Sequence, residues 1–155
     1  MERQRFADMS RAEAVRTAAL CLTAKGKRHD HQRRIPGASL AEAARRLGRA
    51  RLGKIRRFDV LHSLIAETCA DLDRFGELTR YDVAFRIGAH LGIEPERVYL
   101  HAGTRKGAHA LGLPHRRATL AVKDLPQDLQ QLRPWQAEDF LCIYADELAR
   151  FRGAR

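Results

Sequence analysis

Residues 59–92 read DVLHSLIAETCADLDRFGELTRYDVAFRIGAHLG, and this stretch decides the fold. Apolar side chains recur three and four positions apart on both sides of a short break, which is the spacing of one face of an α-helix. Asp59 is the expected cap of the first helix and Thr79 that of the second, with Gly92 as its end. The apolar face predicted for the first helix consists of Val60, Leu61, Leu64, Ile65, Cys69 and Leu72.

The same spacing extends outward from this helix pair to both ends of the chain. Ser39 with Glu42 has the pattern of a capping box, in which the serine hydroxyl and the glutamate each bond a backbone N–H. Only residues 118–123 look extended. The other predicted helices run from near Ser10 to Ala24, from Ser39 to Leu47, from Pro95 to Ala110 and from Pro134 to Phe151. We therefore expect an all-α fold of about seven helices in one globular domain over residues 1–155.

The positive charge of the chain is concentrated in its first third. The 155 residues have a net charge of +10, and residues 1–57 hold 16 Lys/Arg against 5 Asp/Glu. We therefore distinguish a basic N-terminal helical part, 1–57, from a second helical part, 58–155. A localised basic surface is typical of proteins that bind a polyanion. The alternative is that the charge only keeps the protein in solution.

Composition also bears on location and on metals. The sequence has no apolar run long enough to cross a membrane and no apolar stretch typical of a secretory signal. The three cysteines are far apart and form no C-x-x-C pair, which favours reduced thiols in the cytoplasm over a zinc site. The sequence thus predicts a cytoplasmic protein with no membrane contact, no metal and no cofactor.

The break between the two central helices reads Arg74-Phe75-Gly76-Glu77-Leu78-Thr79. It resembles the hairpin of helix-hairpin-helix proteins, whose pattern is Gly-apolar-Gly-x-x-Thr. In that motif backbone N–H groups at a helix N-terminus bind one phosphate. Arg74 stands at the first glycine position. The alternative is an ordinary turn between two helices.

The resemblance extends to the DNA glycosylases of the helix-hairpin-helix superfamily and covers about residues 60–145. Residues 101–107, HAGTRKG, follow the second helix as that family's catalytic segment does, and Pro134-Trp135 opens a later helix. In that family the segment carries an aspartate, and here His101 takes its place. The resemblance therefore implies a related helical scaffold without base-excision chemistry.

Polar and small residues gather around His101 in the sequence. They suggest a phosphate or ligand pocket, and the alternative is two helices packed closely through small residues. The pocket would contain Tyr99, His101, Thr104, Arg105, Lys106 and His109.

We expect non-catalytic binding to nucleic acid, to duplex DNA rather than RNA, through phosphate contacts. Only 6% of the residues are aromatic, which does not favour a stacking surface for single strands. The rival hypotheses are an enzyme with an altered catalytic group on a glycosylase-like scaffold, and a protein-interaction module. The expected nucleic-acid contacts are Lys25, Lys27, Arg28, Arg33, Arg34, Arg74, Gly76 and Thr79.

Overall fold

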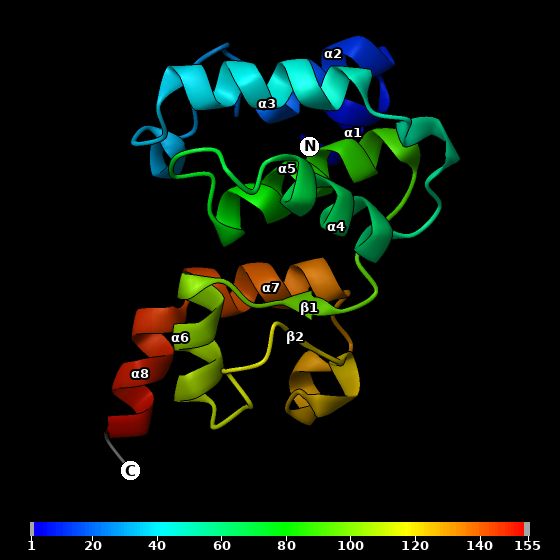
Figure 1. Ribbon diagram of the computed structural model, residues 1–155. Coiled ribbons are helices and arrows are strands. Elements are labelled where there is room, and N and C mark those ends of the chain that lie inside the picture. Colours follow the sequence, from blue (N-terminus) through cyan, green and yellow to red (C-terminus); the bar gives the residue numbers. More distant parts are fainter. Residues whose placement is uncertain (1, 154–155) are drawn as a thin grey trace. The chain divides into compact units, whose positions relative to one another are not determined.

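The computed structural model describes residues 2–153, and α-helices dominate it (Figure 1). The all-α prediction is confirmed, with eight α-helices in the described residues where about seven were expected. The helices are α1 Glu2–Ala7, α2 Arg11–Ala19, α3 Gly37–Arg49, α4 Phe58–Thr68, α5 Glu77–Leu91, α6 Ala102–Ala110, α7 Pro134–Ile143 and α8 Ala145–Gly153. The only sheet in this part of the chain is antiparallel and pairs β1 Val98–Tyr99 with β2 Thr119–Leu120. None of these helices is long and apolar enough to cross a membrane.

The chain divides into two compact units, which we call the N-terminal unit (up to Glu94) and the C-terminal unit (from Pro95). The helices on both sides of residue 57 belong to the same unit. The expectation of one domain over residues 1–155 stays a prediction.

In the N-terminal unit, α5 packs against α1, α2 and α4, and α3 packs against α2 and α4. Phe6, Phe58 and Phe75 are at most 1% exposed and are among the largest buried side chains. Burial of each such side chain stabilises the fold by roughly 2–3 kcal/mol. Val60 was expected on the buried face of α4 but is 48% exposed. It lies on the opposite side of the helix from Leu61 and Ile65, which are completely buried.

Some helix ends follow local signals and others do not; for example, α4 begins at Phe58, so Asp59 lies inside the helix that it was expected to cap. Ser10 and Glu13 form the capping box that starts α2, and Gly92 ends α5 in the left-handed conformation with a φ of 71°. The capping box predicted at Ser39 is wrong, because α3 begins at Gly37 after Pro36 and Ser39 is buried within the helix. Glu42 pairs instead with Arg45 and Arg46 on the next turn.

The C-terminal unit has a core built from β1, α6, α7 and the segment that follows β2. The helix predicted from Pro95 is wrong in its first part, because residues 98–99 form a strand and α6 begins at Ala102. The long last helix is divided at Tyr144 into α7 and α8. The buried core residues are Val98, Leu100, Ala108, Leu120, Leu125, Ala137 and Leu141.

Candidate functional site

The basic segment, residues 25–34, has a defined backbone conformation and is bonded to the rest of the N-terminal unit. Leu22 and Arg28 form an antiparallel bridge, and residues 30–32 form a turn of 3₁₀-helix. Gln32 is 1% exposed, and its Nε2 donates to the Asp82 carboxylate of α5 at 2.7 Å. His31 bonds the same carboxylate at 2.8 Å. Two side chains therefore anchor the segment to the central helix.

This anchoring turns most of the cations of the basic segment toward solvent. Lys25, Lys27, Arg33 and Arg34 are all exposed. Arg33 pairs with exposed Asp30, a contact that contributes little to stability. Arg28 differs from the others, because its Nη1 donates to the Ile35 carbonyl at 2.8 Å and the residue is half-buried. Arg28 therefore helps to hold the segment in shape.

In the turn between α4 and α5, the residue with a positive φ is not the glycine. Gly76 is the N-cap of α5 with a φ of −79°, and nothing lies within 4 Å of a Cβ built on it. The positive φ falls on Arg74, at 57°. Thr79 was expected to cap the helix, but it lies within the first turn and is 5% exposed. Phe75 between them anchors the turn in the core.

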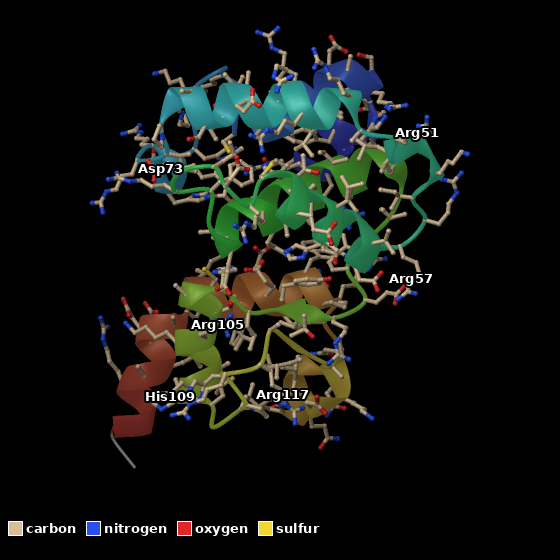
Figure 2. All side chains as sticks on the ribbon, viewed as in Figure 1. Arg51, Arg57, Asp73, Arg105, His109 and Arg117 are labelled. Carbon is tan, nitrogen blue, oxygen red and sulfur yellow. The ribbon has the colours of Figure 1, made fainter. Side chains whose placement is uncertain are left out.

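The turn and the basic segment lie side by side, since Arg74 Nη1 donates to the Arg34 carbonyl at 3.3 Å. Acidic residues also surround the turn. Asp71, Asp73 and Glu77 are exposed there, and Asp73 is labelled in Figure 2. They would repel a phosphate approaching the first amides of α5, so the turn is a weaker anion site than the basic segment.

A second group of exposed cations lies at the other end of α3. Figure 2 shows Arg51 there, at the end opposite Asp73, and Arg57 farther down at the start of α4. Arg49, Lys54 and Arg56 are also exposed. Along the helix itself much charge is neutralised. Arg46 bonds both Glu42 and Asp71. The hydrogen bonds from Arg45 and then from Arg46 lower the pKa of Glu42 to about 2. Exposed cations therefore lie beyond both ends of α3, but not all of them are unpaired, since Arg33 pairs with Asp30 and Arg57 pairs with Asp59.

The residues of the predicted ligand pocket are held in different surroundings. His101 and Thr104 are buried, with exposed fractions of 2% and 0%. Arg105 donates to the carbonyls of His115 and Arg117, and exposed Lys106 pairs with Asp146. His109 is exposed, and its ring packs edge to face on His115 with centroids 4.6 Å apart (Figure 2). Tyr99 is half-buried in β1.

His101 belongs instead to a cluster that sequence reasoning missed. Its Nε2 lies 2.5 Å from Oε1 of Glu138, and both side chains are nearly fully buried. One ligand atom each from His101, Glu138 and Cys142 lies within 4.8 Å of the others. The available signal was the i, i+4 spacing of Glu138 and Cys142, which places both on one side of α7.

None of the three cysteines forms a disulfide. Burial raises the pKa of Cys21 to about 12 and that of Cys69 to about 11, so both remain protonated thiols at neutral pH. These two cysteines are packing residues. Cys142 is only partly buried and lies beside two other ligand-type side chains.

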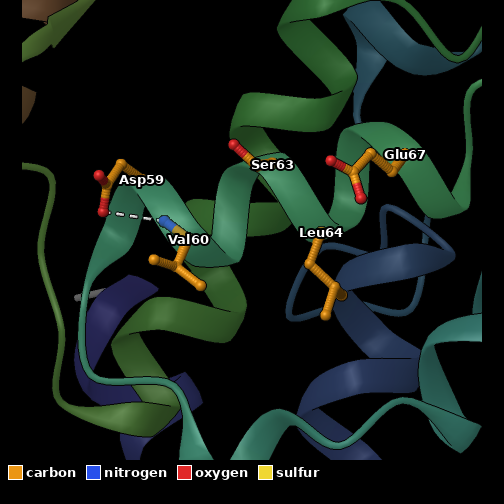
Figure 3. Close-up of a pocket in the computed structure, with 5 residues that line it drawn as sticks. All are labelled: Asp59, Val60, Ser63, Leu64 and Glu67. Carbon is orange, nitrogen blue, oxygen red and sulfur yellow. Dashed lines mark hydrogen bonds between the residues drawn. The ribbon is translucent and has the colours of Figure 1, made fainter.

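An exposed side of α4 carries a shallow pocket of about 390 Å³ (Figure 3). Val60 and Leu64 give it an apolar surface, and Asp59, Ser63 and Glu67 give it a polar one. The Asp59 carboxylate accepts from the backbone N–H of Val60 at 2.9 Å, as the helix N-terminus favours. Its acidic groups make this pocket unsuitable for phosphate.

Comparisons with protein-family models, with curated proteins and with solved structures found no match.

Proposed function

We propose that the N-terminal unit binds the phosphate backbone of nucleic acid through the basic segment, residues 25–34. One observation carries the proposal: Lys25, Lys27 and Arg34 are exposed and form no ion pair with any carboxylate of the described residues. Unpaired cations on an ordered backbone contact phosphates without first breaking internal salt bridges. Each contact releases condensed counterions, which drives this kind of binding.

The surroundings of the segment support the same proposal. The bonds of Gln32 and His31 to Asp82 hold the segment against α5, so little backbone freedom is lost on binding. Arg74 lies beside Arg34 and adds a cation at the edge of the surface. The acidic residues near the turn leave its amides a secondary contact. A helix-hairpin-helix contact is thus the minor part of the proposal.

The length of α3 favours duplex over single-stranded nucleic acid. Thirteen residues at 1.5 Å each separate its two basic ends by roughly 20 Å. A separation of this size allows contact with phosphates on both sides of a major groove, which is about 12 Å wide in B-DNA. Binding of this kind follows the backbone and reads few bases.

The test compares the salt dependence of duplex binding in two triple variants. We expect Lys25→Ala/Lys27→Ala/Arg34→Ala to lower the slope of log affinity against log salt by up to about 2.7, or about 0.9 for each contact. The matched control Arg116→Ala/Arg117→Ala/Lys123→Ala removes three exposed cations from the C-terminal unit and should leave most of the slope intact. Equal losses in the two variants would mean that only net charge matters. Absence of binding to any duplex at low salt would end the proposal.

A separate variant tests the turn. Val at position 76 meets no neighbour and has an acceptable φ, so Gly76→Val should fold normally. Weaker binding by this variant would assign a phosphate to the turn amides. Unchanged binding would leave the turn as a connector beside the basic segment.

The two rival hypotheses have distinct signatures. An enzyme that uses His101 must admit substrate to a side chain that is 3% exposed, and a substrate screen with His101→Ala tests it. A protein-interaction module would bind its partner with little salt dependence, whereas phosphate binding weakens steeply with salt.

A further inference from the structure

The buried cluster of the C-terminal unit combines three different ligand atoms. His101 supplies a ring nitrogen from the residue before α6, and Glu138 and Cys142 supply an oxygen and a sulfur from one side of α7. The three atoms lie within 4.8 Å of one another. The cysteine adds a sulfur ligand to what would otherwise be a histidine–glutamate pair.

The packing of α6 on α7 holds these groups together. A Cβ on Gly103 would lie 2.7 Å from Cys142 Sγ, and one on Gly107 would lie 2.1 Å from the Leu141 carbonyl oxygen. Gly107 therefore permits an approach of the helices that a side chain would prevent, and a side chain at position 103 would displace the Cys142 thiol. Thr104 Oγ1 accepts from the His101 backbone N–H at 2.6 Å and fixes the start of α6. The ligand atoms are thus positioned by buried backbone rather than by mobile surface side chains.

We propose that His101, Glu138 and Cys142 bind a zinc ion. Nitrogen, sulfur and carboxylate oxygen are its usual ligands, whereas Mg²⁺ and Ca²⁺ prefer oxygen alone. Metal–ligand distances of about 2.0–2.3 Å in a tetrahedron separate the ligand atoms by about 3.3–3.6 Å. The histidine and glutamate therefore move apart by about 1 Å, and the cysteine closes in.

Charge balance favours the same assignment. A neutral imidazole, a carboxylate and a thiolate carry two negative charges, which Zn²⁺ neutralises in a buried site. The Cys142 thiol loses its proton to solvent on binding, so affinity rises with pH. The nearest cations on α6 are bound elsewhere, with Arg105 on backbone carbonyls and Lys106 on Asp146. Three protein ligands leave a fourth position for water or a small ligand.

The test uses the full chain stripped of metal and titrated with Co²⁺ and Zn²⁺. We expect one equivalent of Co²⁺ to produce a thiolate-to-cobalt charge-transfer absorption, which Zn²⁺ then abolishes by displacement. Cys142→Ser should lose this absorption, and the matched control Cys69→Ala, a buried cysteine of the N-terminal unit, should keep it. His101→Asn and Glu138→Gln should each weaken Zn²⁺ binding tenfold or more, measured by competition with a chelator.

Two results would overturn the proposal. One is Zn²⁺ binding by the wild-type chain with no thiolate absorption from Co²⁺, which would assign the metal to surface groups such as His29 and His31. The other is an unchanged absorption in Cys142→Ser. The cobalt spectrum of the wild-type chain tests for a cysteine ligand even if a variant fails to fold. Circular dichroism of each metal-free variant checks its fold. Nucleic-acid binding by the N-terminal unit plays no part in this experiment.

Discussion

The unit up to Glu94 and the unit from Pro95 each contain an ionisable pair with a buried member, but the two pairs differ in the exposure of the partner. In the N-terminal unit Arg86 is 5% exposed and bonds Glu2, whose side chain is 42% exposed. In the C-terminal unit both His101 and Glu138 are buried, with a cysteine beside them. A half-exposed partner lets water screen the first pair. The second pair has no such access, and its stability depends on close helix packing.

This difference assigns the two proposed functions to different units. The N-terminal unit presents exposed cations on an anchored segment, which suits a large polyanion approaching from solvent. The C-terminal unit directs its ligand-type side chains inward, which suits a single small ion. Variants in one unit should therefore leave the proposed function of the other unchanged.

The largest expected effect is at the helix crossing of the C-terminal unit. Gly107→Ala places a Cβ 2.1 Å from a backbone oxygen, so α6 and α7 must move apart. We expect a loss of about 3 kcal/mol in the free energy of unfolding. Urea unfolding followed by the fluorescence of Trp135, the only tryptophan of the chain, measures it in the unit concerned.

The matched control lies in the other unit. Gly48 is in α3, and nothing lies within 4 Å of a Cβ built there. Gly48→Ala should stabilise the protein by up to about 1 kcal/mol through helix propensity. A Gly107→Ala protein that unfolds like the wild type would show that the helix crossing tolerates a side chain, and the positioning argument for the metal site would fail with it.

A smaller effect is expected at the buried pair of the N-terminal unit. Glu2→Gln leaves the Arg86 guanidinium buried without a carboxylate, and we expect a loss of about 1 kcal/mol, kept small because Glu2 is half-exposed. Arg86→Met removes the charge as well and should cost less than Glu2→Gln. Unfolding curves of the two variants followed by circular dichroism decide the order. The reverse order would mean that Arg86 contributes packing that its charge does not explain.

The sequence predicts these units unevenly, for a physical reason. Signals that act within one helical turn, such as the capping box at Ser10 and the left-handed Gly92, can be recognised in the sequence because the interacting residues are close together in the chain. The same pattern at Ser39 misleads, because Pro36 starts the helix earlier. The central helix pair follows directly from apolar spacing, but the first helix ends at Thr68, before the Cys69 and Leu72 that its predicted face included.

The buried polar residues that the sequence did not predict have partners far away in the chain. Gln32 is buried where it bonds Asp82, which is 50 residues away in sequence. Glu138 is buried where it bonds His101, which is 37 residues away. No local pattern distinguishes Gln32 from an ordinary surface residue, and the local sign for Glu138 is limited to its i, i+4 spacing to Cys142. The basic segment was recognisable from composition alone, whereas its order and the ligand cluster required the fold.

The smallest expected effect is a pH dependence confined to the anchor of the basic segment. The hydrogen bond of His31 to the Asp82 carboxylate raises the pKa of His31 above its ordinary value, against the opposing effects of burial and of Arg86. Burial, followed by Arg86, lowers the pKa of nearby His29. A raised histidine pKa adds stability that is complete below the unfolded pKa of about 6.5 and is lost as the pH rises through the folded pKa. A lowered one adds stability above about pH 6.5 that is lost as the pH falls.

The two histidines should therefore act in opposite directions between about pH 5 and pH 8. His31→Asn should destabilise the protein more at the acidic end, and His29→Asn more at the alkaline end, as measured by urea unfolding at both values. Both differences should be small, because the His31 side chain is 46% exposed and solvent screens its contact with Asp82. In an Asp82→Asn background the acid-side difference for His31→Asn should disappear, since the carboxylate that raises the pKa is gone. If it persists, another group raises the pKa of His31, and the anchor of the basic segment then rests on Gln32 alone.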